Sequence, residues 1–89
     1  MAEIISGNPY DEEGDIRTFH SYVKTDELVW HRDNEDRKIT VIEGEGWQFQ
    51  FNGSLPMELR KDRMFEIPRD MYHRLIKGKT KLVLRIEKI

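Results

Sequence analysis

The apolar residues of this chain fall in short runs separated by polar or turn-forming residues, and the runs have the period of a β-strand. Residues 47–51 alternate strictly, with aromatic rings on one face and glutamines on the other. Residues 38–42 are rich in β-branched side chains, and Asn52-Gly53 is typical of a hairpin turn. Further strands are expected at 19–23, 27–31, 56–60, 64–67, 72–76 and 82–86. The last two are expected to form a closing hairpin, and no segment predicts a helix longer than one turn.

Many short strands with turn signals between them indicate a small barrel or sandwich. The chain has 89 residues, which is enough for one domain with one modest core. Residues 1–15 combine glycine, proline and an acidic cluster. We expect them to form an N-terminal arm that pairs at a sheet edge or with a partner chain. Residues 16–89 then form the β-barrel domain.

Composition narrows the class of function. Hydrophobic residues make up 37% of the chain and charged residues 36%, and the formal net charge is −2, so a nucleic-acid partner is not expected. The chain has no cysteine, which excludes disulfides and thiolate metal sites. It shows no signal peptide and no apolar run of the ~20 residues needed to span a bilayer. We therefore expect a cytoplasmic protein without a membrane partner.

Two segments, 30–46 and 65–74, each place a histidine beside a β-type run. The first resembles the motif G-x5-H-x-H-x3-4-E-x6-G of the cupin superfamily. Counted back from its closing glycine, the positions of that motif fall on Thr25, His31, Asp33, Arg37 and Gly44. Two of these match the family residues, His31 and Gly44, and the first motif is therefore degenerate.

The second segment resembles the motif G-x5-P-x-G-x2-H-x3-N of the same superfamily. Its positions fall on Asp62, Pro68, Asp70, His73 and Lys77, of which Pro68 and His73 match. The resemblance spans residues 28–86. It implies an all-β fold, a single small cupin-like β-barrel with jelly-roll topology, in which the two histidines meet and usually hold a metal. Many cupins are dimers, so it also implies a homodimer.

A cupin metal site needs imidazole and carboxylate donors that converge from neighbouring strands. The resemblance assigns this role to His31, Asp33 and His73, a set suited to one divalent metal: Fe, Mn, Ni or Zn. Arg37 opposes such a site if it points inward, because a guanidinium stays charged and cannot ligate. A barrel without metal, in which the histidines form internal hydrogen bonds, is the alternative.

Two other side chains are candidates for the donor set. Glu35 lies in the loop of the first motif and either swings in as a carboxylate donor or stays solvated. His20 is either a third imidazole or a histidine at the surface of a strand edge, and the surface position is favoured.

An inward Arg37 also suggests an anion site, because a guanidinium pairs with carboxylate or phosphate through two parallel hydrogen bonds. An internal salt bridge from Arg37 to Asp33 or Glu35 is equally consistent with the sequence. The candidate residues for binding a small polar or anionic ligand are Arg37, Gln48, Gln50 and Tyr72. Trp30 and Tyr72 flank the two histidines and either wall the pocket mouth or pack at its rim.

The direction of the two glutamines depends on strand register, because a shift by one residue exchanges the faces of a strand. Alignment on the family glycine turn places Gln48 and Gln50 inside and leaves the aromatic residues for a dimer partner to cover. The opposite register puts Trp47, Phe49 and Phe51 in the barrel. We favour the aromatic core.

Three functions stay open at this point. The first is a small-molecule-binding protein whose barrel takes a polar or anionic ligand, with or without a divalent metal. The second is a metal-dependent enzyme of the isomerase, dioxygenase or lyase type. The third is a non-catalytic oligomerisation or interaction module. The chain has no P-loop, no dinucleotide-binding glycine motif before a helix and no nucleophile elbow, so catalytic residues are not assigned.

Overall fold

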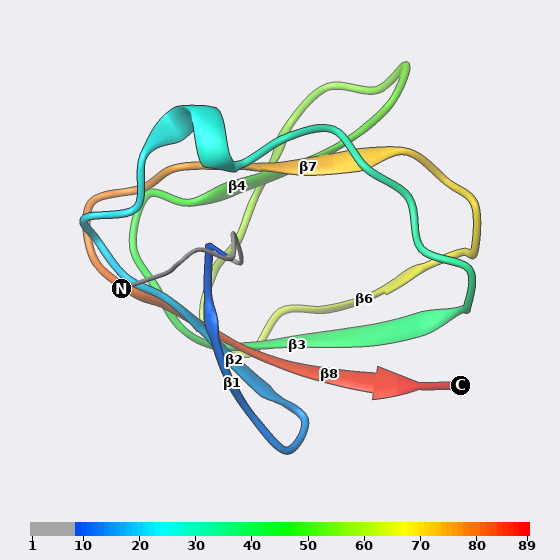
Figure 1. The fold of residues 1–89 in the computed structure, drawn as a ribbon, viewed down its shortest axis with the longest axis horizontal. Helices are drawn as coiled ribbons and strands as arrows, with labels where there is room; N and C mark the ends of the chain where they lie inside the picture. Colours follow the sequence, from blue (N-terminus) through cyan, green and yellow to red (C-terminus); the bar gives the residue numbers. More distant parts are fainter. Residues whose placement is uncertain (1–8) are drawn as a thin grey trace, which may run out of the picture.

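The computed structural model describes residues 9–89, which form two antiparallel sheets that face each other (Figure 1). The five-stranded sheet has the order β1-β2-β8-β3-β6, and the three-stranded sheet has the order β5-β4-β7. The strands are β1 (Asp11–Glu13), β2 (Ile16–Phe19), β3 (Arg37–Glu43), β4 (Gln48–Phe51), β5 (Met57–Glu58), β6 (Met64–Ile67), β7 (His73–Ile76) and β8 (Leu82–Lys88). The sheets are thus the two walls of a small barrel.

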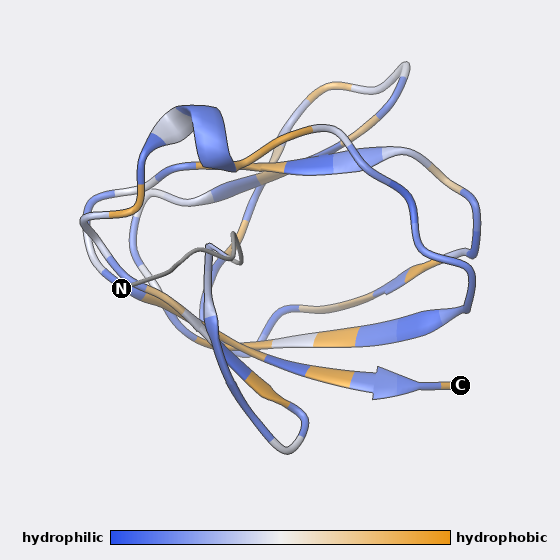
Figure 2. Ribbon diagram, viewed as in Figure 1, coloured by the Kyte–Doolittle hydropathy of each residue, from blue (hydrophilic) through white to orange (hydrophobic). Residues whose placement is uncertain are grey.

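The barrel interior follows from the alternation of side chains along each strand. Ile39 and Val41 on β3 are buried, as are Leu82 and Leu84 on β8, because residues two apart share one face of a strand. Figure 2 shows the resulting change from hydrophobic to hydrophilic residues along these strands. Both sheets contribute to one core, which consists of Phe19, Val23, Ile39, Val41, Trp47, Phe49, Leu59, Ile67, Leu82 and Leu84.

The strands with the clearest sequence signals are where the pattern predicts them. The predicted strand at 64–67 coincides with β6, and the segments 38–42, 47–51 and 56–60 contain most of β3, β4 and β5. β4 and β5 form the hairpin expected around Asn52-Gly53, and Gly53 has a φ of +82°. In residues 9–89 the only helical element is the 3-10 turn Thr25–Glu27, so no helix there is long and apolar enough to cross a membrane.

The strands predicted at 19–23 and 27–31 were wrong in extent. β2 ends at Phe19, and the Val23 N–H donates to the carbonyl of His20 at 3.1 Å, which closes a turn. The Lys24 N–H then donates to the Glu27 carboxylate at 3.1 Å and opens the 3-10 turn. These local hydrogen bonds give the Val23 and Lys24 N–H groups acceptors within the same segment. The segment therefore does not depend on hydrogen bonds to a neighbouring strand.

The prediction that 72–76 and 82–86 form a closing hairpin was also wrong. β7 pairs with β4, whereas β8 pairs with β2 and β3 in the other sheet. Residues 77–81 therefore cross between the sheets. They are fixed to the turn before β4, because the Lys79 N–H donates to the Glu45 carbonyl at 2.9 Å and the Trp47 indole N–H donates to the Thr80 carbonyl at 2.7 Å.

The N-terminal region reaches the edge of the five-stranded sheet. β1 pairs with β2, with Asp11 opposite Thr18 and Glu13 opposite Ile16. The expected boundary between residues 15 and 16 falls at the turn of this hairpin, where Gly14 has a φ of +62°. Residues 11–13 thus pair at a sheet edge, and residues 1–8 of the expected arm lie outside the described residues.

Candidate functional site

Two segments, residues 31–36 and 69–73, run side by side where the chain passes between the two sheets (Figure 1). They continue the antiparallel pairing of β3 with β6 around the corner of the barrel. Three sets of contacts join them: Arg69 N–H to the Asp36 carboxylate (2.8 Å), Asp70 N–H to the Asp33 carbonyl (2.6 Å), and backbone hydrogen bonds in both directions between His31 and His73 (3.0 and 2.9 Å). This pairing fixes the backbone that carries the motif residues.

The bridge between His31 and His73 brings both imidazoles to one face. Directly opposed residues of an antiparallel pair point the same way. The two rings are edge to face, with centroids 4.4 Å apart. His73 is buried at 4% exposure, whereas His31 stays exposed at the mouth of the barrel. The sequence motifs therefore identified two histidines that the fold does bring together.

Each imidazole has its Nδ1 tied to a backbone carbonyl two residues earlier in the chain. His31 Nδ1 lies 3.0 Å from the Val29 oxygen, and His73 Nδ1 lies 2.8 Å from the Met71 oxygen. A carbonyl only accepts, so we assign the proton to Nδ1 in both rings. The Nε2 lone pairs are then available, which is the tautomer that ligates a metal through Nε2.

Arg37 points into the barrel, on the same face of β3 as Ile39 and Val41. Its terminal nitrogens lie 3.4 Å from Asp33 Oδ2 and 3.1 Å from Glu35 Oε1. The internal salt bridge considered from the sequence is thus present, and it uses both carboxylates. Arg37 Nε is buried without a hydrogen-bond partner among residues 9–89, so the guanidinium is held through its two terminal nitrogens.

Glu35 belongs to this ion-pair network. The possible metal donors that cluster among the described residues are those of His31, Asp33 and His73, and Glu35 is not one of them. Its second oxygen lies 3.5 Å from the Lys88 ammonium. Its hydrogen bond with Arg37 is the main cause of a lowered pKa, which keeps the Glu35 carboxyl ionised. Glu35 therefore pairs with one terminal nitrogen of Arg37, and Asp33 pairs with the other.

The donor atoms of His31, Asp33 and His73 all lie within 4.8 Å of one another. Asp33 Oδ2 is 3.5 Å from His73 Nε2 and 3.4 Å from the Arg37 guanidinium. Two imidazoles and one carboxylate are the donor set of a face-capping metal site. A ligating carboxylate is commonly paired with a further group, and Arg37 takes this place beside Asp33. The residues present therefore fit a divalent metal.

Burial lowers the pKa of His73 below its usual value, and the positive charge of Arg37 acts in the same direction. The Met71 carbonyl and Asp33 oppose this shift but do not reverse it. His73 is therefore neutral near pH 7, which is the form that a metal binds.

A pocket of about 290 Å³ opens beside the cluster and is lined by His31, Asp33 and Arg37 among others. It adjoins a smaller inner hollow of about 50 Å³ that His73 also lines. Arg17 borders both spaces and was missed by the sequence analysis. The signal was present, because Arg17 stands two residues before the buried Phe19 and so shares its face.

The sequence matches no protein-family model and no curated protein. Solved structures do resemble the fold. Protein NMB1881 from Neisseria meningitidis superposes with a TM-score of 0.54 at 19% sequence identity, covering 100% of this chain and 89% of that one. A cupin-2 domain containing protein from Shewanella frigidimarina gives 0.51 at 22% identity, covering 100% of this chain and 85% of that one. This chain has a small cupin-like fold. At these identities the likeness concerns the fold alone.

The cupin-like fold explains two departures from the second family motif. Asp62 and Asp70 stand where the motif has glycine, and they are the non-glycine residues with positive φ in the described chain, at 72° and 63°. Glycine suits this left-handed backbone best, and aspartate is among the few other residues that adopt it readily. Asp62 and Asp70 therefore adopt a backbone conformation that glycine favours.

The cupin-like barrel buries the aromatic face of β4. Trp47 is fully buried and Phe49 is 3% exposed, so the favoured aromatic core is confirmed. Gln48 and Gln50 consequently lie on the other face. Arg74 Nε donates to the Gln50 amide oxygen at 2.9 Å, and the Gln50 amide donates to the Ser54 carbonyl at 2.9 Å. The alternative register, in which Gln48 and Gln50 face inward as candidate ligand-binding residues, was wrong, and neither lines the pocket beside the cluster.

Tyr72 and Trp30 lie outside the barrel as well. They neighbour the two inward histidines in sequence, and successive strand residues point to opposite faces. Trp30 is 40% exposed under the Arg74 guanidinium, and Tyr72 is 44% exposed under that of Arg32. Tyr72 therefore borders a separate surface hollow with Trp30 and not the main pocket.

His20, the third histidine, is separate from the cluster. Its Nε2 lies 2.5 Å from Asp11 Oδ2, and its ring stacks on Tyr22. This is the surface position that the sequence favoured.

Proposed function

We propose that this cupin-like protein binds a small polar or anionic molecule in its barrel, beside a divalent metal held by His31, Asp33 and His73. One observation carries the proposal. The donor atoms of these three residues lie within 4.8 Å of one another beside a pocket of about 290 Å³. Structural metal sites are usually closed by protein ligands, whereas sites that act on small molecules keep open positions.

The charge distribution supports a cation at this place. The two imidazoles are neutral in the assigned tautomer, and Asp33 contributes one negative charge. Among residues 9–89 Arg37 is the only guanidinium paired with Asp33, and Glu35 pairs with the other terminal nitrogen of Arg37. A cation at the cluster would therefore contact the Asp33 carboxylate, whose partner Arg37 is also paired with Glu35.

The same observation supports a second candidate, a metal-dependent enzyme. Three protein donors leave coordination positions open toward the pocket, and a bound metal would supply Lewis acidity or activate oxygen there. In that case His31, at the pocket mouth, and His73, in the inner hollow, hold the metal between them. A cupin-like fold hosts many reactions, so it does not select an isomerase, dioxygenase or lyase.

Metal content tests the proposal. The protein is purified without chelator or metal-affinity resin, analysed by elemental mass spectrometry, and titrated with Fe²⁺, Mn²⁺, Ni²⁺ and Zn²⁺ by calorimetry. We expect about one equivalent of metal in the wild type. His31→Ala and His73→Ala should each lose it, and His20→Ala is the matched control that keeps it, because His20 pairs with Asp11 at the surface.

Folding of each variant is checked by circular dichroism. If the folded wild type takes up none of the four metals, the proposed metal site does not exist. Retention of one equivalent in the folded His31→Ala/His73→Ala double variant would equally remove the assignment.

A further inference from the structure

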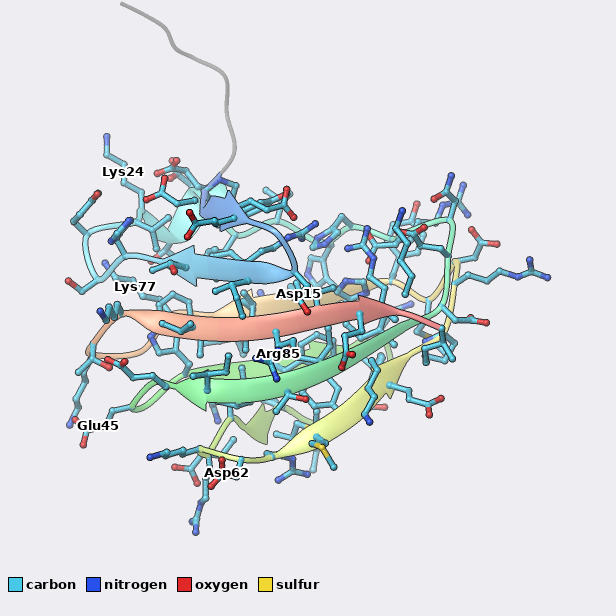
Figure 3. The ribbon with its side chains drawn as sticks, turned by 90° about the horizontal axis from the view of Figure 1, so that it is seen from below. Asp15, Lys24, Glu45, Asp62, Lys77 and Arg85 are labelled. Carbon is cyan, nitrogen blue, oxygen red and sulfur yellow. The ribbon has the colours of Figure 1, made fainter. Side chains whose placement is uncertain are left out.

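Arg17 is an inward cation that the metal cluster does not use. It lies on β2 opposite Leu84 of β8, and the side chains of both point toward the barrel interior. The Arg17 side chain is only 17% exposed. Its neighbour along the register, Arg85 opposite Ile16, instead lies on the outer side of the sheet near Asp15 (Figure 3). The two arginines of adjacent strands thus face opposite sides of the same sheet.

Two neighbours hold the Arg17 guanidinium in place. Its Nε donates to Glu12 Oε2 at 2.9 Å, and the ring centroid of Tyr10 lies 4.3 Å from its central carbon. A guanidinium has five N–H donors, and this arrangement uses one edge and one face. Within residues 9–89 no acceptor binds the two terminal nitrogens of Arg17. These are the nitrogens that pair with a planar anion through two parallel hydrogen bonds.

The pocket combines this cation with an apolar wall. The charged and imidazole side chains that line the pocket of about 290 Å³ are those of Arg17, Glu27, His31, Asp33 and Arg37. The rest of its lining is Pro9, Tyr10, Phe19, Leu28, Val29 and Leu75. Arg37 is the other guanidinium of the pocket, and two carboxylates already occupy it. Among the described residues that line the pocket, Arg17 is therefore the guanidinium whose terminal nitrogens are available to a ligand, and it has one carboxylate partner, Glu12, where Arg37 has two. Glu27 and Asp33 disfavour a second negative charge, because like charges repel.

We propose that Arg17 anchors the ligand and that the ligand is a small, singly charged carboxylic acid with a short apolar body. This inference rests on the proposed function, because it concerns the ligand of the same pocket. The carboxylate meets the Arg17 terminal nitrogens, and the apolar body lies against Phe19, Leu28 and Leu75. In the metal-free protein phosphate is disfavoured, because its second charge meets no further cation with free donors among the described residues that line the pocket.

The test is a ligand titration of the full chain after metal has been removed with chelator, followed by changes in nuclear magnetic resonance chemical shifts. The probes are acetate, isobutyrate, hexanoate and benzoate, together with inorganic phosphate and the neutral benzamide. We expect one of the apolar carboxylates to bind with the highest affinity, and benzamide and phosphate to bind at least tenfold more weakly. Arg17→Gln should weaken the best carboxylate at least tenfold, and Arg17→Lys should restore part of the loss, because lysine keeps the charge but not the planar fork.

Arg85→Gln is the matched control, because it removes an arginine from the outer face of the adjacent strand and should leave the affinity unchanged. Circular dichroism confirms that each variant is folded. Equal carboxylate binding by folded Arg17→Gln and wild type would overturn the inference, as would tighter binding of phosphate than of any carboxylate. Absence of binding by all four carboxylates would also overturn it.

Metal titration separates this inference from the metal site. Arg17→Gln should keep the metal affinity of the wild type, because Arg17 is not among the three clustered donors. Metal binding without carboxylate binding leaves the metal proposal standing and removes this one. If the protein takes up no metal but binds carboxylates through Arg17, this inference stands and the metal site is removed.

Discussion

At the residue scale, the His73 imidazole meets a different neighbour on each side. The Met71 carbonyl accepts from Nδ1, Asp33 lies near Nε2, and the Phe49 ring stacks on one face with centroids 5.3 Å apart. These contacts fix both the tautomer and the orientation of the ring. Burial then favours the neutral ring and lowers its pKa. A buried histidine of this kind links the stability of the fold to pH.

The pH dependence has a definite sign. A histidine whose pKa is lower in the folded than in the unfolded state binds fewer protons when folded. Its contribution to the free energy of unfolding is fully present above its ordinary pKa of about 6.5 and is lost as the pH falls through its folded pKa. We expect urea unfolding of the metal-free protein to show this loss as the pH falls below about 6.5, and His73→Phe to show a smaller loss.

The measurement is made with chelator present, so that metal does not contribute. Leu75→Ala is the control, because it removes a non-titrating side chain from the same strand and should keep the wild-type slope with pH. If the free energy of unfolding of His73→Phe changes with pH as steeply as that of the wild type, groups other than His73 cause the pH dependence.

At the element scale, the crossover 77–81 decides the topology. A two-strand hairpin would have left β7 and β8 in one sheet, whereas the crossover sends β8 to the other wall. Gly78 allows it, because a Cβ at this position would contact the Trp47 ring and come within 2.5 Å of both the Glu45 carbonyl and the Trp47 nitrogen. The backbone of two segments meets there without room for a side chain.

Gly78→Ala should therefore destabilise the protein strongly. The clashing atoms include backbone, which cannot move aside as a flexible side chain does, and we expect a loss of about 3 kcal/mol or more. Gly53→Ala is the control. Its Cβ meets nothing within 4 Å and only the φ of +82° opposes it, so we expect a loss of about 1 kcal/mol. Urea unfolding measures both. Similar losses for the two variants would contradict the close approach at Gly78.

At the scale of the whole molecule, the candidate metal site links the two walls of the barrel. His73 belongs to β7 of the three-stranded sheet, and Asp33 lies in the segment that leads to β3 of the five-stranded sheet. A metal that binds both residues would bind the folded chain much more tightly than the unfolded chain. Ligand binding of this kind stabilises a fold by mass action.

Thermal unfolding should therefore depend on metal. At a free metal concentration 100 times its Kd, the free energy of unfolding should rise by about 2.7 kcal/mol. For a domain of this size that corresponds to a Tm increase of roughly 10–20 °C. His73→Ala should lose the increase and His20→Ala should keep it, and excess chelator should reverse it. If added metal leaves the Tm of the wild type unchanged, this result would argue against a metal site between the sheets.

The oligomeric state also belongs to this scale. The homodimer expected from the sequence stays a prediction, as does an interaction module. One argument for both, that a partner covers the aromatic residues of β4, no longer applies, because Trp47 and Phe49 fill the core. Sedimentation at several protein concentrations decides between monomer and dimer.

The sequence by itself determined much of the local structure and part of the site. Alternation and turn residues located β3, β4 and β6, because a period of two and a left-handed turn depend on neighbouring residues only. Motif spacing singled out His31, Asp33 and His73, and the fold brings their possible donor atoms within 4.8 Å of one another. In this chain the two motif segments pair through backbone hydrogen bonds, which brings the side chains that the spacing singled out to one place.

The tertiary structure alone decided which strands pair and which faces turn inward. Periodicity shows that a strand has two faces, but the neighbouring sheet selects the buried one. This selection placed Gln48 and Gln50 outside, turned Arg37 inward between two carboxylates, and added Arg17 to the pocket. The pairing of β8 with β2 and β3 likewise depends on contacts far apart in the chain, which no local pattern contains.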